Sequence, residues 1–242
     1  MGTYKISDLE NLSGIKAHTI RIWEQRYSIL TPLRSDTNIR YYDDIQLRRL
    51  LNVVSLIKAG IKISKISKLS ENELKTQVNS LINNEDSTLK EEMLINQLIS
   101  AGLTYDEASF DKSFSKAILN FGLLDAYQKI LHPMLVKIGV LWTTYELMPS
   151  QEHFITSLIR QKIFSAIESL PLPSNTTEKW VLFLPEGELH DLGLLIANFA
   201  LRLKGNHIVY LGENVPQKNL YEVAHNVIPT HYLTFVVKGQ KK

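Results

Sequence analysis

The first 70 residues carry short apolar stripes at helical spacing, interrupted by one polar stretch. Ser7–Glu10 is typical of a capping box that opens a first helix, and a second helical pattern runs from about Ala17 to Tyr27. Residues 33–42 combine polar turn residues with two tyrosines, which predicts a hairpin or wing. A third helix is predicted from Asp43 to Lys58. The pattern therefore predicts a small helical domain with a wing over residues 1–70.

Residues 71–172 are predicted to form a second domain, a helical bundle, although its first residues, 71–88, are polar and show no clear pattern. Helical periodicity runs through 89–170, and its breaks lie near Gly102, Gly122 and Pro149. Four helices of the length found in bundles fit this span, so we expect a four-helix bundle.

The pattern changes again after a polar, proline-containing linker at 171–177. Apolar runs typical of buried strands then alternate with helical segments, and the strands are predicted at Trp180–Leu184, His207–Leu211 and Tyr232–Val237. Alternating strands and helices predict a parallel sheet over 178–242. The expected fold class is thus multidomain, α and α/β.

Composition excludes several classes of protein. The 242 residues are 44% hydrophobic and 21% charged, as in ordinary globular proteins. The absence of cysteine excludes disulfide frameworks and thiolate metal sites. No apolar run approaches the ~20 residues that a membrane span needs, and the N-terminus is not typical of a signal peptide. A cytoplasmic protein without a membrane partner is expected.

Charge is unevenly distributed along the chain. Residues 1–70 hold 12 Lys/Arg and 6 Asp/Glu, a net charge of +6, whereas residues 71–242 hold 15 and 19, a net charge of −4. A small basic domain followed by a mildly acidic remainder indicates a polyanionic partner for the first part only.

The first two helices and the tight turn at Ser13–Gly14 have the spacing of a helix-turn-helix, whose second helix enters the major groove of DNA. Candidates for contacts with base edges are Lys16, His18, Thr19 and Arg21. Guanidinium groups and hydroxyls suit phosphate oxygens. In the wing, the candidates for phosphate contacts are Arg34, Thr37, Asn38, Arg40 and Tyr41. The alternative is a small protein–protein interaction module.

Particular residues of this region favour a DNA-binding domain over a protein–protein interaction module. The segment TIRIWEQRY over 19–27, followed by Pro32, Arg34 and RYYD over 40–43, closely resembles the MerR family of regulators. The resemblance implies a winged helix-turn-helix that binds double-stranded promoter DNA as a dimer, with a sensor domain placed after it. It also implies that Trp23 and Tyr27 are core and interface residues and that Glu24 pairs with an arginine. Metal-sensing members use cysteines, which this chain lacks.

Two further motifs lie in the second half. Trp142 is followed at a distance by Glu152-His153, and Glu188-x-His190-x-x-Gly193 follows the first predicted strand. Open α/β sheets bind ligands outside the carboxyl ends of their strands. There, His190 can offer an imidazole nitrogen to a metal while Glu188 orients the ring. Gly193 would allow a ligand to approach the backbone closely.

In this order after a MerR-like domain, the motifs resemble the cobalamin-binding, light-sensing regulators of the MerR family. The resemblance implies a helical cap over 71–172 and a partial Rossmann-like domain over 178–242. His190 would be the lower axial ligand of the cobalt of adenosylcobalamin. Trp142 would cover the upper face, with Glu152 and His153 beside it. Such regulators are repressors that form homo-oligomers, dimers or tetramers.

One departure and two alternatives accompany this interpretation. The resembled cobalamin domain has further strands after the third, so we expect the chain as it stands to bind cobalamin weakly. In one alternative, the C-terminal region serves only oligomerisation or partner binding. In another, the chain is similar to cobalamin-dependent methyltransferases. We rank this last because the sequence shows neither a catalytic acid–base pair nor a substrate domain. A regulator without enzymatic activity is the leading expectation.

Overall fold

The computed structural model describes residues 3–34, 38–80, 87–143 and 148–237, without the side chains of residues 87, 140–143 and 175–176. The chain divides into two compact units, Met1–Ile155 and Thr156–Lys242. The first unit is helical apart from the wing, and the second holds a parallel sheet with helices. The predicted fold class is confirmed.

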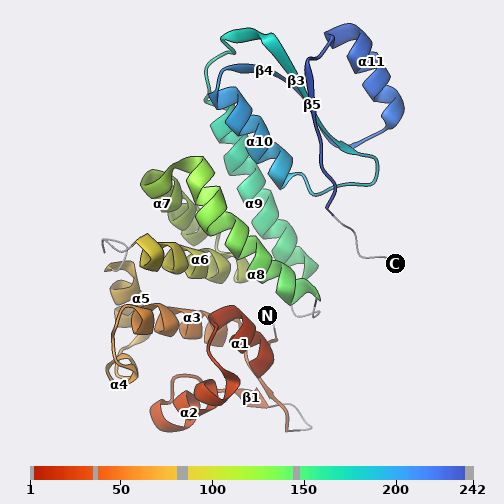
Figure 1. Cartoon of the computed structure of the whole chain (residues 1–242). Helices are drawn as coiled ribbons and strands as arrows, with labels where there is room; N and C mark the ends of the chain where they lie inside the picture. The colour runs from red at the N-terminus through yellow and green to blue at the C-terminus, as the bar shows by residue number, and fades with distance from the viewer. Residues whose placement is uncertain (1–2, 35–37, 81–86, 144–147, 238–242) are drawn as a thin grey trace. The chain divides into compact units, whose positions relative to one another are not determined.

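The N-terminal part folds as a helix-turn-helix followed by a wing, coloured red to orange in Figure 1. Gly14 makes the turn with φ of +72°, a conformation that favours glycine, and its N–H donates to the carbonyl of Glu10. Leu9, Ile20 and Leu50 are fully buried and join the helices in one core. The elements are α1 (Ile6–Ser13), α2 (Ala17–Tyr27), β1 (Leu33–Arg34), β2 (Arg40–Tyr41) and α3 (Asp44–Lys58).

The start of α1 differs from the prediction. The helix begins at Ile6 with Lys5 as its N-cap, and the carboxylate of Asp8 accepts a hydrogen bond from the backbone N–H of Lys5. The reason lies just upstream. Tyr4 exchanges backbone hydrogen bonds of 2.8 and 2.9 Å with Tyr42, so the chain is held extended up to Lys5 and the helix starts at once. The predicted capping box at Ser7–Glu10 was wrong in register.

The described residues between Ile63 and Glu168 are mostly helical, and the predicted breaks are confirmed. The first long helix ends after Gly102, the second contains Gly122 with non-helical φ and ψ of 72° and 166°, and the last begins at Pro149. The elements are α4 (Ile63–Ile66), α5 (Glu71–Ser80), α6 (Ser87–Leu103), α7 (Glu107–Ala126), the π-helical segment η2 (Tyr127–Leu131), α8 (His132–Thr143) and α9 (Pro149–Glu168).

Within the described residues, no helix is both long and apolar enough to cross a membrane.

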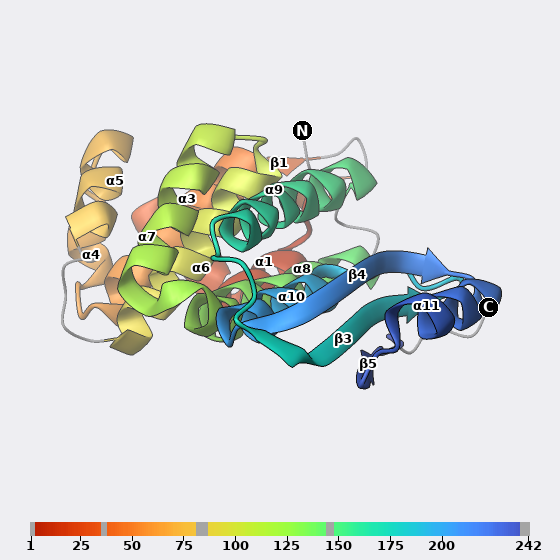
Figure 2. The same ribbon diagram turned by 90° about the horizontal axis from the view of Figure 1, so that it is seen from above.

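The second unit is a three-stranded parallel sheet with the strand order β4-β3-β5, as Figure 2 shows. Helix α10 packs on one face against Leu182 and Leu184, and α11 packs on the other against Val181 and Phe183. Successive residues of one strand thus face opposite layers. The elements are β3 (Asn175–Pro185), α10 (Leu192–Leu203), β4 (Asn206–Val215), α11 (Gln217–Val227) and β5 (His231–Leu233).

All three strands differ from the prediction in their boundaries, and β4 continues to Val215, where it pairs with Pro185 of β3. β3 begins inside the predicted linker because Asn175 pairs with Asn206 of β4. β5 ends at Leu233 because the chain then leaves the sheet. The ring of Phe235 lies where a Cβ on Gly193 would be, and the N–H of Val237 donates to the carboxylate of Glu188 over 2.8 Å.

Candidate functional site

Helix α2 presents a continuous stripe of exposed, mostly polar residues to solvent. Its exposed residues are spaced by three and four positions, which places them on one face of the helix. Ile20 and Trp23 lie on the buried face and fix the helix on the core. The exposed stripe consists of His18, Arg21, Ile22, Gln25 and Arg26.

The predicted base-reading residues lie at the start of this helix. Lys16 is the N-cap residue of α2, and its ammonium group pairs with Glu10 over 2.9 Å while 74% of the side chain stays exposed. His18 and Arg21 are exposed, and Thr19 is half-buried with its hydroxyl 3.3 Å from His18 Nε2. The structure therefore brings these four residues together. Gln25 and Arg26 were not predicted, although their helical spacing from Arg21 gives a signal for them.

In the wing, two of the predicted arginines lie opposite each other on neighbouring strands. Arg34 pairs with Arg40 across the β1–β2 hairpin, and its guanidinium group donates to the side chain of Asn38. All three side chains are exposed, and Tyr41 is half-buried. Thr37 lies outside the described residues.

Glu24 connects α2 to the wing. Its carboxylate is buried, accepts a hydrogen bond from the hydroxyl of Tyr42 and lies 4.0 Å from Nε of Arg40. Burial and the neighbouring carboxylate raise the pKa of Tyr42, so the hydroxyl remains a donor. The prediction that Glu24 pairs with an arginine is confirmed.

The loop between β3 and α10 holds the Glu188–His190 motif at the carboxyl end of the central strand. Glu188 is buried, whereas 73% of the His190 side chain is exposed. One carboxylate oxygen, Oε1, lies 2.5 Å from His190 Nδ1 and accepts from the backbone N–H of His190 over 3.0 Å. Within the described residues, the other ring nitrogen, Nε2, has no hydrogen-bond partner.

The second carboxylate oxygen of Glu188 accepts from the backbone N–H of Val237. Burial alone raises the pKa of Glu188, but the donors from His190 and Val237 outweigh it and hold this pKa below its ordinary value. The loop is also tied to the end of β4. The side-chain oxygen of Asn214 accepts from the backbone N–H of Gly187 over 2.9 Å, and the backbone N–H of Asn214 donates to the carbonyl of Glu188 over 3.1 Å.

Arg160 of α9 holds the other end of the loop. Its guanidinium group donates to both carboxylate oxygens of Asp191 over 2.7 to 3.1 Å, and Asp191 is buried. The sequence analysis missed both residues. The signal available was weak: an arginine among the apolar residues of a helix, and an acidic residue directly after His190.

Gly193 lies in the first turn of α10, where a Cβ would come within 2.9 Å of the Phe235 ring. The group that approaches this backbone in the structure is thus a side chain of the same unit. Gly193 as a ligand contact stays a prediction.

The predicted upper-face residues belong to the first unit, whereas the His190 loop belongs to the second. Trp142 is in α8, but its side chain lies outside the described residues. His153 Nδ1 is 3.4 Å from Glu152 Oε2 in the first turns of α9, and 76% of the His153 side chain is exposed.

Comparisons with known proteins match two parts of the chain to known families. Residues 4–73 match the model of the MerR HTH family regulatory protein, and residues 94–165 match that of the B12 binding domain. The chain is 29% identical to the HTH-type transcriptional repressor CarH of Myxococcus xanthus, over 90% of this chain and 73% of CarH. It is 28% identical to the repressor CarA of the same organism, over 94% of this chain and 74% of CarA.

Among solved structures, the methanol:cobalamin methyltransferase complex MtaBC from Methanosarcina barkeri is a distant match. It has a TM-score of 0.32 and 17% identity, over 76% of this chain and 69% of that one. A likeness this distant indicates nothing about function.

The two family matches define the class of protein, a helix-turn-helix transcription regulator with a B12-binding domain. The chain thus joins a MerR-type helix-turn-helix domain to a B12-binding domain. The resemblance stated from the motifs is confirmed, and cobalamin is the cofactor of this module.

Proposed function

We propose that the chain is a repressor that binds operator DNA through the exposed stripe of α2 and the wing. The observation that carries this is the placement of Arg21 and Arg40 on two elements that Glu24 holds together. A helix in the major groove reads base edges, and the arginines of the wing bind phosphates and set the register. The similarity to CarH and CarA supports repression rather than activation.

A gel shift with operator DNA at increasing salt tests this surface. Affinity should fall steeply with salt because bound phosphates release counterions. Arg21→Ala should weaken binding by ~1–3 kcal/mol and relax sequence preference, whereas Arg40→Ala should weaken binding to all sequences alike. Lys218→Ala, at an exposed cation of α11, is the matched control. Unchanged binding by both arginine variants would remove this surface from the proposal.

The cobalamin ligand that we propose is His190. The donor set fits the group, since imidazole nitrogen is a ligand for cobalt and a buried carboxylate already fixes the other nitrogen of the ring. When bound, cobalamin supplies a cobalt–carbon bond that light can break. Glu188 would orient the ring, Gly193 would keep the backbone of α10 accessible, and Trp142, Glu152 and His153 would cover the upper face.

Absorption spectra of the chain loaded with hydroxocobalamin test the ligand. His190→Ala should abolish the spectrum of histidine-ligated cobalamin and weaken retention of the cofactor. His225→Ala, at an exposed histidine on α11, should change neither. A wild-type spectrum in the His190 variant would exclude His190 as the ligand.

We further propose three functional parts, namely 1–70 for DNA binding, 71–172 as the helical cap and 178–242 as the lower cobalamin domain. The regulator would act as a homo-oligomer, without enzymatic activity, and respond to light through adenosylcobalamin. Light scattering of the loaded chain in the dark and after illumination measures the oligomer directly. A mass that does not change on illumination would contradict light sensing.

Trp142→Ala should abolish any preference for adenosylcobalamin over methylcobalamin.

A further inference from the structure

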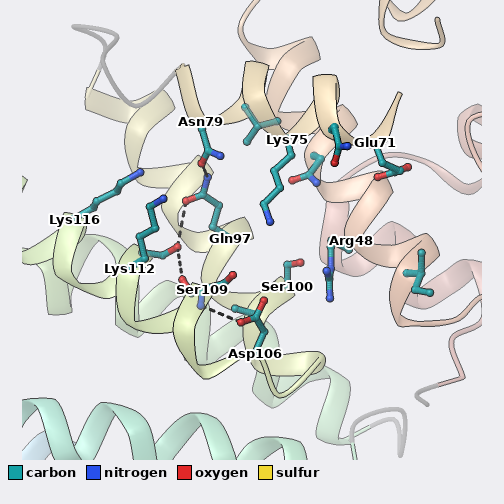
Figure 3. Close-up of a pocket in the computed structure, with 16 residues that line it drawn as sticks. Arg48, Glu71, Lys75, Asn79, Gln97, Ser100, Asp106, Ser109, Lys112 and Lys116 are labelled. Carbon is teal, nitrogen blue, oxygen red and sulfur yellow. Dashed lines mark hydrogen bonds between the residues drawn. The ribbon is translucent and has the colours of Figure 1, made fainter. Parts of the chain in front are cut away.

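A cavity of about 430 Å³ whose lining includes several charged and amide side chains lies in the first unit between the DNA-binding domain and the helical bundle. Its walls come from α3 of the winged domain, from α5, and from α6 and α7 of the bundle. The volume lies in the range of ~300–1,000 Å³ typical of small-molecule sites. Figure 3 shows the side chains that line it.

The charged residues of this cavity favour an anion. Four are cationic and two are anionic, a net charge of +2. Both anionic groups are engaged. Glu71 pairs with Arg49, outside the cavity, and Asp106 caps α7 by accepting from the N–H of Ser109 over 3.0 Å. The cationic residues make no ion pair with the described part of the chain; they are Arg48, Lys75, Lys112 and Lys116.

The cations are compensated only in part: Arg48 and Lys75 contribute, after the hydrogen bonds from Ser109, to the lowered pKa of Asp106, and the net charge of the lining stays positive. The Nε of Arg48 is buried and has no hydrogen-bond partner among the described residues. Burial and the charge of Lys112 lower the pKa of Lys116. A buried polar group without a partner costs free energy, and so does a pair of close like charges. An anion in the cavity would relieve both costs.

The uncharged wall between the cations is itself ordered. The amide of Gln97 donates to the side chain of Asn79 and accepts from Ser113, both over 3.3 Å. In Figure 3 the Lys75 ammonium group reaches the space between Gln97 and Arg48. The cavity thus combines fixed amides with cations on three helices.

We propose that this cavity binds a phosphorylated small molecule and that its occupancy regulates DNA binding. Lysine ammonium groups bind phosphates as point charges, and arginine binds them through paired N–H donors. A water molecule occupies about 30 Å³ of liquid, so the cavity is too large for one phosphate alone and has room for an organic part that the amides can contact. Because α3 forms one wall and α6 and α7 another, the ligand would bridge the DNA-binding domain and the bundle.

Isothermal titration of the full chain with ADP tests binding, with adenosine and pyrophosphate as reference probes. ADP should bind, pyrophosphate should bind more weakly, and adenosine should not bind measurably. Lys75→Gln with Lys112→Gln should weaken ADP binding about tenfold or more. The matched double variant, Lys204→Gln with Lys218→Gln, removes the same charge from exposed positions of the second unit and should bind like wild type.

Lys116→Gln alone guards against misfolding of the double variant and should weaken ADP binding in the same direction. No ADP binding, equal binding of adenosine, or equal weakening by both double variants would each overturn the proposal. The proposal that the ligand regulates DNA binding rests on the proposed function, whereas the titration needs no DNA. A failure of ADP binding can therefore be told apart from a failure of DNA binding.

Gel shifts test the regulation. Addition of ADP should change the operator affinity of the wild-type chain and leave that of the cavity variant constant. A cavity variant that loses DNA binding without ADP would instead make these lysines part of the DNA surface.

Discussion

In both the winged domain and the His190 loop, a buried carboxylate contacts an exposed side chain of the proposed site, but the two carboxylates are held by different kinds of contact. Among the described residues, the carboxylate of Glu24 contacts two side chains, the hydroxyl of Tyr42 and the guanidinium group of Arg40, and so joins α2 to the wing. Glu188 accepts from two backbone N–H groups as well as from the His190 ring. A contact between two side chains depends on residue identities at both ends, whereas backbone donors depend on the path of the chain.

This difference decides which contact the sequence reveals. The Glu24 contact belongs to a run of residues that resembles the MerR family, so an arginine partner was predicted. The backbone donors to Glu188 require the path of residues 234–237, which no local pattern encodes.

The largest effect is expected from Glu188→Ala. It removes the acceptor for the His190 ring and leaves two backbone donors without a partner, so affinity for hydroxocobalamin should fall ~10–100-fold. Glu188→Gln keeps an acceptor oxygen and should lose less. Glu186→Ala, at an exposed neighbouring position, is the control for titrations followed by absorption. Equal losses in the 186 and 188 variants would show that the carboxylate does not orient the ring.

Glu24→Ala tests the corresponding contact in the winged domain. The buried hydroxyl of Tyr42 would lose its acceptor, which should cost ~1–3 kcal/mol in the free energy of unfolding. Tyr42→Phe removes the donor instead and should recover part of the loss in the double variant. Urea denaturation measures both, with Gln25→Ala as the exposed control. If Glu24→Ala were as stable as the control, the carboxylate would not hold the wing.

A smaller effect is expected from the ion pair at the other end of the His190 loop. Arg160→Ala leaves the buried carboxylate of Asp191 without its bidentate partner, but Asp191 does not contact the His190 ring. Affinity for hydroxocobalamin should therefore fall by about tenfold or less, the lower end of such effects. Arg160→Lys keeps the positive charge but cannot make the paired hydrogen bonds. Its affinity for hydroxocobalamin should lie between those of wild type and Arg160→Ala. A loss as large as that of Glu188→Ala would contradict the distinct roles of the two carboxylates.

The smallest effect is expected on the free energy of unfolding when the pH is lowered. Hydrogen bonds hold the pKa of Glu188 below its ordinary value, so its ionised form stabilises the folded state. This contribution is fully present above the unfolded-state pKa of about 4.3 and is lost as pH falls through the folded-state value. The difference in unfolding free energy between wild type and Glu188→Gln should be constant from neutral pH down to about 5 and shrink below it. A difference that grows as the pH falls would show that folding does not lower the pKa of Glu188.

The sequence predicted the wing, the parallel sheet and the helices outside residues 71–88 because their apolar spacing is local and regular. It also predicted the Glu188–His190 contact, since the two residues lie within one loop. It could not predict the contact of Arg160 with Asp191, which are 31 positions apart and ordinary as single charges. Nor could it show that lysines from α5 and α7 line one cavity with Arg48, because that depends on how three amphipathic helices pack.

The hydrogen bond from Val237 to Glu188 joins residues 49 positions apart and reaches the same carboxylate as the His190 ring. The amide proton of Val237 is therefore a built-in spectroscopic label for the loop. Its nuclear magnetic resonance frequency and its exchange with deuterium follow the charge and position of that carboxylate. Labelling the valine nitrogens alone would thus report on the histidine's environment without touching the histidine.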